Sequence, residues 1–543
     1  MKSKIIILIG YLVLFLIIFH KSYILLDPDF GYRLVTGQKI LAGNIPKIDI
    51  YSYTMPSFPY VEHSFLIAAF WAFVYKYVGY AGLAFANSII ALSALIVATT
   101  VYSAGKPKTY HFLNKPFGRD WSLLGQFTFI LAFCLMLPFI GIRAQIVSWL
   151  IISIFLKFLL TPKLWEKYKL LTPLFFLFWA NTHGSFMAGL SMLFLVTVVR
   201  IYKLLFNTTN IFLEIKTHGV KVFSKTLATL SKTKAGKIIT LELSIVVLSG
   251  VITLLNPYRF GLWREVWLSV SDSSLRWKIL EWMPPFLSVD LGFVSFFSIS
   301  LFFVFRYRKK FPVENFVLYV FVLSQALVTK RHVPLWMLVA LPMTTQAITF
   351  LYTDVSNITL GKERFRTFYK IMWMIAIIIF SVSIYSSFKG AQYMAVDKFY
   401  PVGAVNYLNE YTPNGQIYSL YGWGGYLIWQ LPEKKVFVDG RMPSWRWKNA
   451  PDNESNNAFS EYDDILRGKL DLSWAVDRYG IDTVLISPKK EKLNSYEEIK
   501  KKLNSFLLGD KDNNFNFYEA LEKNGFEIVY KDTNSVIYHR HPI

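Results

Sequence analysis

The sequence predicts a polytopic α-helical membrane protein with about eleven transmembrane helices and a C-terminal extracytoplasmic α/β domain. Three observations support this fold class. The 543 residues are 54% hydrophobic and 17% aromatic, a balance that is unusual for a soluble domain. Apolar runs of membrane-helix length recur through residues 1–388, without the two-residue alternation of barrel strands. From residue 389 to residue 543 the composition becomes mixed and polar, over a length sufficient for one domain.

The first apolar run, at about residues 5–25, predicts an uncleaved transmembrane helix. Its apolar core is too long for a signal peptide, and no small-residue cleavage site follows it. Lys2 and Lys4 precede the run, which places the N-terminus in the cytoplasm of a protein of the plasma (inner) membrane. The chain therefore emerges on the outer side at "LLDPDFGYRLVTGQ", the start of a first external loop at residues 27–62.

The later apolar runs alternate with basic loops. Residues 63–78 are apolar but short, and they could form an interfacial helix or half of a hairpin. The basic clusters fall on the cytoplasmic side and account for the formal net charge of +22. Because they are divided among short loops, they build no continuous groove for nucleic acid. We expect spans at about residues 80–103, 121–140, 146–160, 240–255, 291–305, 313–328, 333–350 and 371–387, with one more on each side of the stretch "NTHGSF".

With this topology, the short motifs that contain unusual polar groups all fall on the outer side. Ionisable groups at membrane depth are costly and are usually functional, so their convergence on one face predicts one shared site. The residues concerned are Asp27, Asp29, Arg143, Gln145, Asn181, His183, Asn256, Arg259, Glu281, Arg331 and His332.

Asp27 and Asp29 are the candidate catalytic residues. Two carboxylates two residues apart on an extended loop can point at one Mg²⁺ or Mn²⁺ ion, or one of them can act as a general base. The alternative is that Pro28 ends a helix and both aspartates are solvated. Arg33 could pair with one aspartate and keep it ionised. The single cysteine, Cys134, lies in an apolar run, so a disulfide framework or a zinc site is excluded.

The candidate phosphate-binding residues are cationic. Arg143 and Arg331 each lie at the outer end of a span, and guanidinium groups bind phosphate oxygens bidentately. For either arginine alone, snorkelling to lipid headgroups is the alternative. The stretch "TKRH" makes Lys330, Arg331 and His332 a compact anion-binding group. A lipid phosphate, with its tail between helices, is the natural ligand.

Four further residues are candidates for substrate binding. Glu62 and His63 form an outer pair in "PYVEHSF", and His183 lies in "WANTHGSF". Glu281, in "LEWMPP", could orient a substrate or complete a metal shell. The alternatives are a structural histidine and a plain surface glutamate.

The C-terminal segment shows alternating strand and helix patterns. "QIYSL", "KVFVDG", "DTVLIS" and "FEIVYKD" predict strands, while "VGAVNYLNEY", "LSWAVDRYG" and "FYEALEKNG" predict helices between them. This is an α/β pattern, and the topology places the domain directly above the candidate site.

The motif "DPDFGYRLVTG" resembles the external-loop motif of oligosaccharyltransferase catalytic subunits. These belong to the GT-C glycosyltransferases, polytopic enzymes that use polyprenyl-phosphate-linked sugars. The resemblance implies a catalytic or metal-binding role for Asp27, with Asp29 as the second candidate. The order of "DPD", "EH", "HG", "NP", "EW" and "DGR" motifs is also similar to that of a widespread bacterial membrane family.

The stretch "IYSLYGWGGYLIWQLPEKKVFVDGRM" is similar to the segment of those subunits that carries the Trp-Trp-Asp-Tyr-Gly motif. Here a glycine pair stands between Trp423 and Tyr426, where the acidic residue would be. This departure argues against asparagine glycosylation. Asp439 and Arg441 then either take over acceptor contacts or end a strand in a turn.

The leading hypothesis is a membrane glycosyltransferase that transfers a sugar or glycan on the outer face. The donor would be a polyprenyl-phosphate-linked sugar, and the acceptor a glycan, lipid or protein. Two alternatives stay open. A lipid-linked glycan transporter or flippase would need polar groups along the whole membrane depth, and an inactive scaffold would use its outer domain to bind partners.

Overall fold

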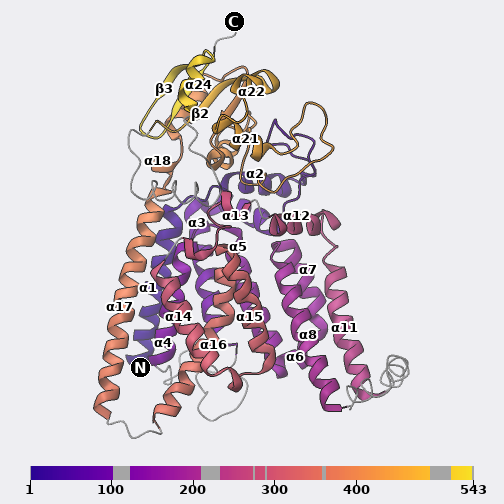
Figure 1. The fold of residues 1–543 in the computed structure, drawn as a ribbon, viewed down its shortest axis with the longest axis vertical. Helices are drawn as coiled ribbons and strands as arrows, with labels where there is room; N and C mark the ends of the chain where they lie inside the picture. The colour runs from indigo at the N-terminus through magenta and orange to yellow at the C-terminus, as the bar shows by residue number, and fades with distance from the viewer. Residues whose placement is uncertain are drawn as a thin grey trace.

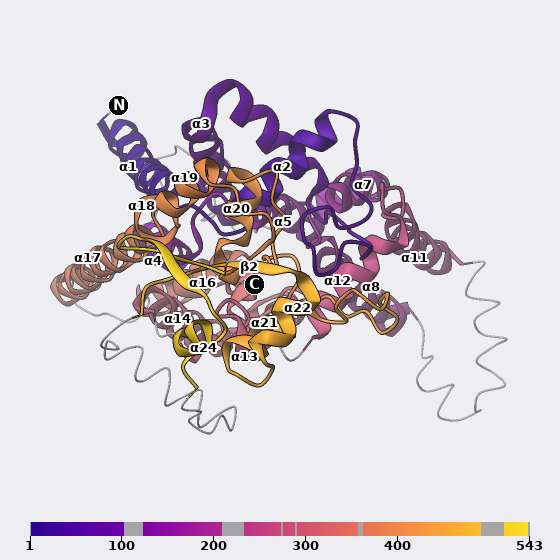
Figure 2. The same ribbon diagram turned by 90° about the horizontal axis from the view of Figure 1, so that it is seen from above.

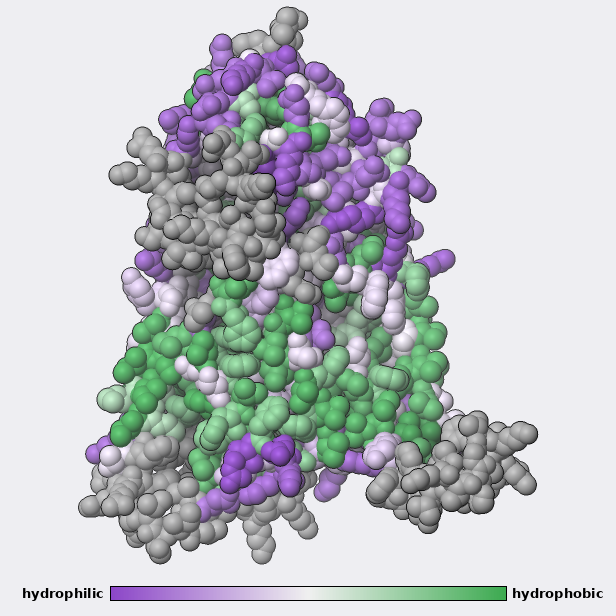
Figure 3. All heavy atoms as spheres, in the orientation of Figure 1, coloured by the Kyte–Doolittle hydropathy of each residue, from purple (hydrophilic) through white to green (hydrophobic). Residues whose placement is uncertain are grey.

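The computed structural model describes residues 2–101, 123–208, 233–272, 275–287, 290–356, 362–489 and 515–540. A bundle of helices carries a mixed α/β domain at one end, and the N-terminus lies at the opposite end of the bundle (Figure 1). On the face shown in Figure 3, apolar side chains form a belt across the bundle, whereas hydrophilic side chains predominate on the coloured part of the domain. The predicted fold class, a helical membrane protein with a C-terminal α/β domain, is confirmed.

Each predicted span coincides with a helix of the described chain. Six of these helices are individually long and apolar enough to cross a membrane, and a pair bent by 98° after residue 160 could supply a seventh span. Three others are apolar but shorter, so the predicted number of crossings stays a prediction. The helices are α1 (Lys2–Ile24), α3 (Phe65–Thr99), α4 (Leu123–Met136), α5 (Ala144–Leu160), α7 (Thr172–Thr182), α8 (Phe186–Thr208), α11 (Lys234–Ile252), α14 (Leu291–Arg306), α15 (Val313–Val328), α16 (Val333–Ser356) and α17 (Lys362–Tyr393).

Residues 63–78 form the first part of α3 rather than a separate element. The helix breaks at Gly79, whose φ of 71° is available to glycine at little cost. Seen from above, the first part of α3 lies across the end of the bundle before the chain turns (Figure 2).

The expectation of an extended loop after Asp27 is wrong. A helix, α2 (Phe30–Leu41), begins directly after Asp29 and is largely buried. It packs closely against α3, because Gly37 has no Cβ. A Cβ at this position would overlap the Ala68 carbonyl. Only residues 42–64 form an irregular connection, and this segment contacts the C-terminal α/β domain at Val436. We call this domain the outer domain after the side of the membrane that the sequence predicts for it.

The outer domain is built on a four-stranded sheet with strand order β1-β2-β4-β3. β1 and β2 are parallel, whereas β4 pairs antiparallel with both β2 and β3. The three predicted helices are confirmed, but "KVFVDG" makes only isolated bridges at Val436, and β4 and three helices of the described segment were missed. The elements are α19 (Val402–Glu410), β1 (Gln416–Ser419), α20 (Gly424–Gln430), α21 (Ala458–Leu466), α22 (Leu472–Tyr479), β2 (Ile481–Ile486), α24 (Phe517–Lys523), β3 (Glu527–Lys531) and β4 (Val536–His539).

A hydrophobic cluster joins the domain to the bundle. It combines Phe30 and Trp71, from α2 and α3, with Tyr426 and Leu427 of α20. The outer domain is therefore packed onto the end of the bundle, and the residues between them lie in a fixed, partly dehydrated setting.

Candidate functional site

The short segment between α1 and α2 carries the two candidate carboxylates. The Asp27 side chain accepts a hydrogen bond from the Asp29 backbone N–H at 3.0 Å, and Asp29 is the residue that precedes α2. This local bond closes a turn, which fixes the two carboxylates relative to each other.

Arg143 bridges two acidic residues that are far apart in the sequence. Its guanidinium lies 2.6 Å from the Asp27 carboxylate and 2.5 Å from the Glu281 carboxylate. Arg143 lowers the pKa of Glu281 in spite of the opposing effect of burial. Asp27, Arg143 and Glu281 therefore form one ion-paired chain, in which the charge of Arg143 favours the ionised form of Glu281.

Asp29 is in a different state from Asp27. Among the described residues, no side chain pairs with its carboxylate, which lies against the Cα of Gly440 in the outer domain. Burial, and then the nearby charge of Asp27, raise its pKa to about 6, although Arg33 and Arg331 oppose part of this rise. Asp29 is thus a half-buried carboxylate that can accept a proton near neutral pH.

Arg33 is buried behind Asp29 and pairs mainly with Glu62. Its guanidinium donates to the Tyr32 hydroxyl at 2.9 Å and lies 3.7 Å from the Glu62 carboxylate. Glu62 also accepts hydrogen bonds from the Tyr60 hydroxyl and the Ser64 backbone N–H. This pair supports the wall of the site.

The loop that carries Arg331 is tied to the loop that carries Glu281. The Arg331 N–H donates to the Glu281 carbonyl at 3.0 Å, and the Lys330 N–H donates to the Met283 carbonyl at 2.8 Å. The Arg331 guanidinium stacks on Trp282 at 5.0 Å, and no carboxylate in the described part of the chain lies within salt-bridge distance of it. Arg331 therefore offers an uncommitted cation close to Asp29.

The two histidines of the site are neutral. The rings of His63 and His183 lie 5.7 Å apart, and Nδ1 of His183 accepts a hydrogen bond from the Ser185 N–H. Burial, Arg33 and Arg331 lower the pKa of His63 to about 3, and burial lowers the pKa of His183 well below its usual value. Because Nδ1 of His183 is an acceptor, its Nε2 carries the proton and can donate to a ligand.

His332, the next residue after Arg331, points into the protein. Its Nδ1 is buried without a hydrogen-bond partner among the described residues. This ring nitrogen is therefore not presented to a phosphate.

Asp439 and Arg441 lie in a buried ion cluster rather than on an open surface. Arg441 donates to both oxygens of Asp439 and, at 2.7 Å, to Asp49 of the irregular 42–64 connection. The rings of Tyr51 and Trp445 flank its guanidinium at 4.7 and 5.2 Å. The cluster clamps the outer domain to the irregular 42–64 connection.

The glycine pair in "GWGGYL" allows close packing. A Cβ at Gly425 would overlap the Pro28 carbonyl, and a Cβ at Gly31 would overlap the Gly425 carbonyl. Trp423 is turned away, with its Nε1 donating to the Phe399 carbonyl at 2.8 Å. The pair therefore lets α20 rest directly on the turn that carries the aspartates.

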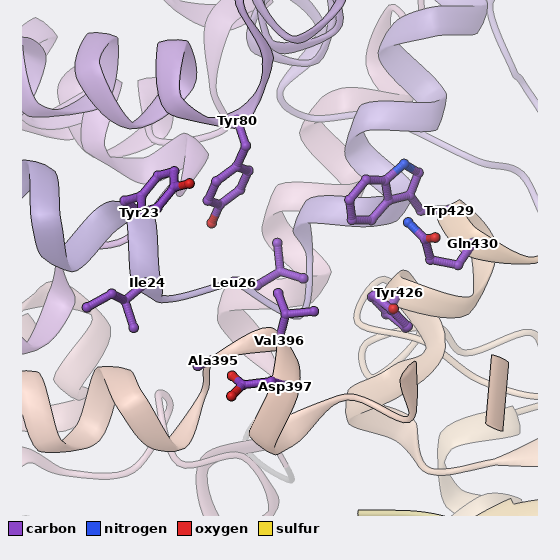
Figure 4. A pocket seen from close by; sticks show the side chains of 10 residues that line it. All are labelled: Tyr23, Ile24, Leu26, Tyr80, Ala395, Val396, Asp397, Tyr426, Trp429 and Gln430. Atoms are coloured by element: carbon purple, nitrogen blue, oxygen red, sulfur yellow. The ribbon is translucent and has the colours of Figure 1, made fainter. Parts of the chain in front are cut away.

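A separate cavity of about 470 Å³ lies beside this turn, where α1 and α17 reach the outer domain (Figure 4). Tyr426 lines it together with residues from α1, α3 and α20. Neither Asp29 nor Arg331 is among the lining residues, so this cavity is distinct from the carboxylate site.

Sequence reasoning missed several residues of this region. Lys21 is buried within α1 and donates to the Leu137 carbonyl, just below Arg143. Tyr421, near Asp29, and Gly440 come from the outer domain. A lysine inside an apolar run was a visible signal, whereas Tyr421 and Gly440 could be found only from the tertiary structure.

The residues present do not form a metal shell. In the described ranges, no three His, Cys, Asp or Glu side chains are grouped to hold an ion. Both Asp27 oxygens are already engaged, one with the Asp29 N–H and the other with Arg143. The predicted Mg²⁺ or Mn²⁺ site at Asp27 and Asp29 therefore does not fit this donor set.

Together, the fold and site define a polytopic membrane protein with a carboxylate–guanidinium site between its helical bundle and its outer domain. No protein-family model and no curated protein matches the chain. Among solved structures, it is similar to ArnT from Cupriavidus metallidurans bound to undecaprenyl phosphate, with 11% identity, a TM-score of 0.45 and 99% of each chain covered. The apo state of that ArnT gives 12% identity and a TM-score of 0.45, covering 98% of this chain and 99% of the other. A likeness of this size carries no argument about function, which has to come from the site.

Proposed function

We propose that the chain is a membrane glycosyltransferase that uses a polyprenyl-phosphate-linked sugar as donor on the outer face of the membrane. The proposal rests on one observation, namely which charged groups of the site lack an ion-pair partner. Among the residues that the structure describes, the Asp29 carboxylate has no cation within salt-bridge distance and the Arg331 guanidinium has no carboxylate, and the two groups share one half-buried setting. Sugar transfer from a phosphate needs both groups, a base for the acceptor and a cation for the leaving group.

In this proposal, Asp29 takes the proton of an acceptor hydroxyl. The hydroxyl oxygen forms a bond to the anomeric carbon of the donor sugar while the bond from that carbon to the phosphate oxygen breaks. The phosphate leaves with the electron pair of this bond and is stabilised by Arg331. A single displacement of this kind inverts the anomeric centre, as the family resemblance also implies.

Asp27 is assigned a positioning role rather than the base. Both its oxygens are engaged, one by the Arg143 guanidinium and the other by the Asp29 N–H, so neither is free to bind an acceptor hydroxyl. Through the bond to the Asp29 N–H, Asp27 holds the base in place. The sequence resemblance favoured Asp27, and the pairing favours Asp29.

The remaining cations and the neutral His183 are proposed to act around the phosphate. Lys330 lies above the Phe139 ring, next to the Glu281 loop, and His183 presents an Nε2–H donor near Arg331. Arg143 becomes available to phosphate only by loosening its pairs with Asp27 and Glu281. His332 is left out of this group, because Nδ1 of its ring is buried in the protein.

The test compares Asp29→Asn with Asp27→Asn in purified protein reconstituted into vesicles. The donor is a radiolabelled polyprenyl-phosphate hexose, and both its consumption and its movement between leaflets are measured. Asp29→Asn should reduce consumption by about 10²–10⁴-fold, the usual contribution of a general base. Asp27→Asn should reduce it less.

Unchanged consumption by Asp29→Asn would remove this residue from the chemistry. If the wild-type protein moved the labelled donor across the bilayer without consuming it, the transporter hypothesis would replace the transferase.

A further inference from the structure

The cavity beside the aspartate turn has its own chemistry. Its volume is about 470 Å³, within the range of roughly 300–1,000 Å³ that is typical of ligand pockets. It opens where the chain leaves α1, where α3 resumes after the Gly79 break, and where α17 passes into α18 (Val396–Phe399). The lining residues are Tyr23, Ile24, Leu26, Tyr80, Ala395, Val396, Asp397, Tyr426, Trp429 and Gln430 (Figure 4).

The cavity lies at the outer edge of the apolar belt. Tyr23, at the outer end of α1, is 52% exposed, and Val396 is 39% exposed. Ile24 and Leu26 add aliphatic surface on the bundle side, whereas α20 of the outer domain supplies the opposite wall. A molecule in this cavity would therefore have its tail beside the helices and its head against the outer domain.

None of the lining residues is a lysine, arginine or histidine, although the whole chain carries a formal charge of +22. The only charged lining group is the carboxylate of Asp397. A phosphate headgroup would therefore meet a like charge and no counterion. This distinguishes the cavity from the site of Arg331 and Lys330.

The polar groups that line the cavity suit hydroxyls. In the described chain, the side chains of Asp397 and Gln430 have no hydrogen-bond or ion-pair partner, and neither does Nε1 of Trp429. A carboxylate accepts from hydroxyls, an indole N–H donates to them, and an amide does both. The rings of Tyr23, Tyr426 and Trp429 offer apolar faces for the C–H side of a sugar ring.

A wall separates this cavity from Asp29. The Tyr400 hydroxyl donates to the Leu26 carbonyl at 3.0 Å, and the centre of its ring lies 4.8 Å from that of Tyr426, with the two rings tilted by 35°. The backbone of Leu25 bridges to Ala395 on the same side. A molecule bound here lies next to the aspartate turn but does not reach the Asp29 carboxylate.

We propose that this cavity binds the neutral, sugar-bearing headgroup of a membrane lipid. The proposal is independent of the transferase assignment, because it concerns binding at a different place. A phospholipid headgroup is the competing occupant, and the charge of the lining disfavours it.

The experiment uses the full-length protein in phosphatidylcholine nanodiscs. The probe is an alkyl glucoside with a photoreactive diazirine in its chain, and cross-linked peptides are mapped by mass spectrometry. Labelling should concentrate on the segments that contain Tyr23 and Val396. Unlabelled alkyl glucoside should compete with the probe, whereas phosphatidylglycerol should not.

Two variants make the test specific. Gln430→Leu removes the amide from the cavity and should weaken glucoside binding about fivefold, the usual effect of one hydrogen bond. Gln392→Leu is the matched control, because this exposed glutamine lies near the outer end of α17 outside the cavity, and it should bind as the wild type does. Equal competition by phosphatidylglycerol, labelling spread evenly around the apolar belt, or equal effects of the two variants would overturn the proposal.

Discussion

Gly440 offers the sharpest test of the geometry at Asp29. A Cβ added at this position would lie 2.0 Å from Oδ1 of Asp29, whereas ordinary van der Waals contact begins at 3.4 Å. Gly440→Ala therefore requires the carboxylate to move by about 1.4 Å, the difference between these two distances. The outer domain cannot readily yield instead, because Asp439 and Arg441 on either side are locked in the buried ion cluster.

The size of the effect follows from this displacement. Misplacing a reacting group by about 1 Å can cost on the order of 10²-fold in rate. We therefore expect Gly440→Ala to lower the turnover number about 100-fold. The donor KM should change little, because Arg331 is not disturbed.

The assay measures consumption of the labelled polyprenyl-phosphate sugar in reconstituted vesicles. Gly422→Ala is the matched control in the same domain, because its Cβ would meet only the edge of Phe399 at 3.3 Å. The double variant Asp29→Asn/Gly440→Ala should be no slower than Asp29→Asn alone, since both changes act on one group.

Three results would refute this reasoning. Gly440→Ala could transfer sugar at the wild-type rate, Gly422→Ala could be equally slow, or the effects of Asp29→Asn and Gly440→Ala could be fully additive. Thermal unfolding in detergent separates these outcomes from simple loss of fold.

Three further predictions concern charge. The pKa of Asp29 is raised to about 6, so its carboxylate is protonated below that pH and turnover should fall about tenfold per pH unit. A turnover number that stays constant between about pH 5 and 7 would contradict the role of Asp29 as base. Arg331→Ala should raise the donor KM by about 10–150-fold, the value of one or two charge-assisted hydrogen bonds, and Arg331→Lys should recover part of this loss; equal KM values for all three proteins would contradict phosphate binding. Arg441→Met should destabilise the fold by about 3–5 kcal/mol, because Asp49 and Asp439 lose their shared buried counterion, whereas an unchanged thermal midpoint in detergent would exclude the clamp.

The sequence was sufficient to predict which residues gather at one end of the bundle. Apolar runs and basic loops fix the order of the spans, and a helix that exits at Asp27 and others that exit at Arg143 and Arg331 must bring these groups to one end. In the structure, Arg143 contacts both Asp27 and Glu281. The positive charge of Arg331 is close enough to Asp29 to lower its pKa. This convergence needed only topology, not atomic detail.

The sequence could not predict how these groups pair. Asp27 and Asp29 look equivalent in "DPDF", and they differ only because Arg143 reaches one of them and Gly440 covers the other. Arg33 lies four residues after Asp29, yet it pairs with Glu62 across the fold. Which carboxylate pairs with which arginine depends on side-chain distances of a few ångströms. The hydrophobic periodicity of a sequence gives no information about such distances.

The glycine pair of "GWGGYL" shows a different limit. Where the Trp-Trp-Asp-Tyr-Gly motif has an acidic residue, this chain has glycines, and on sequence grounds this difference argues against asparagine glycosylation. In the structure, Gly425 is needed for close packing. Without a Cβ at this position, the backbone of α20 can lie directly against Pro28 and Gly31. A departure from a family motif can therefore reflect packing that has replaced recognition.

The outer domain has a direct consequence for the chemistry. The rise in the Asp29 pKa comes first from burial, and the domain contributes to that burial through Gly440. If the domain were lifted from the bundle, water would reach Asp29, its pKa would fall towards that of an ordinary aspartate, and it would become a weaker base. The Arg441 cluster resists this separation, because Asp49 belongs to the first external loop while Asp439 belongs to the domain. The clamp and the base are thus energetically linked, and mutations that loosen the clamp should lower the apparent pKa of the base before they unfold the protein.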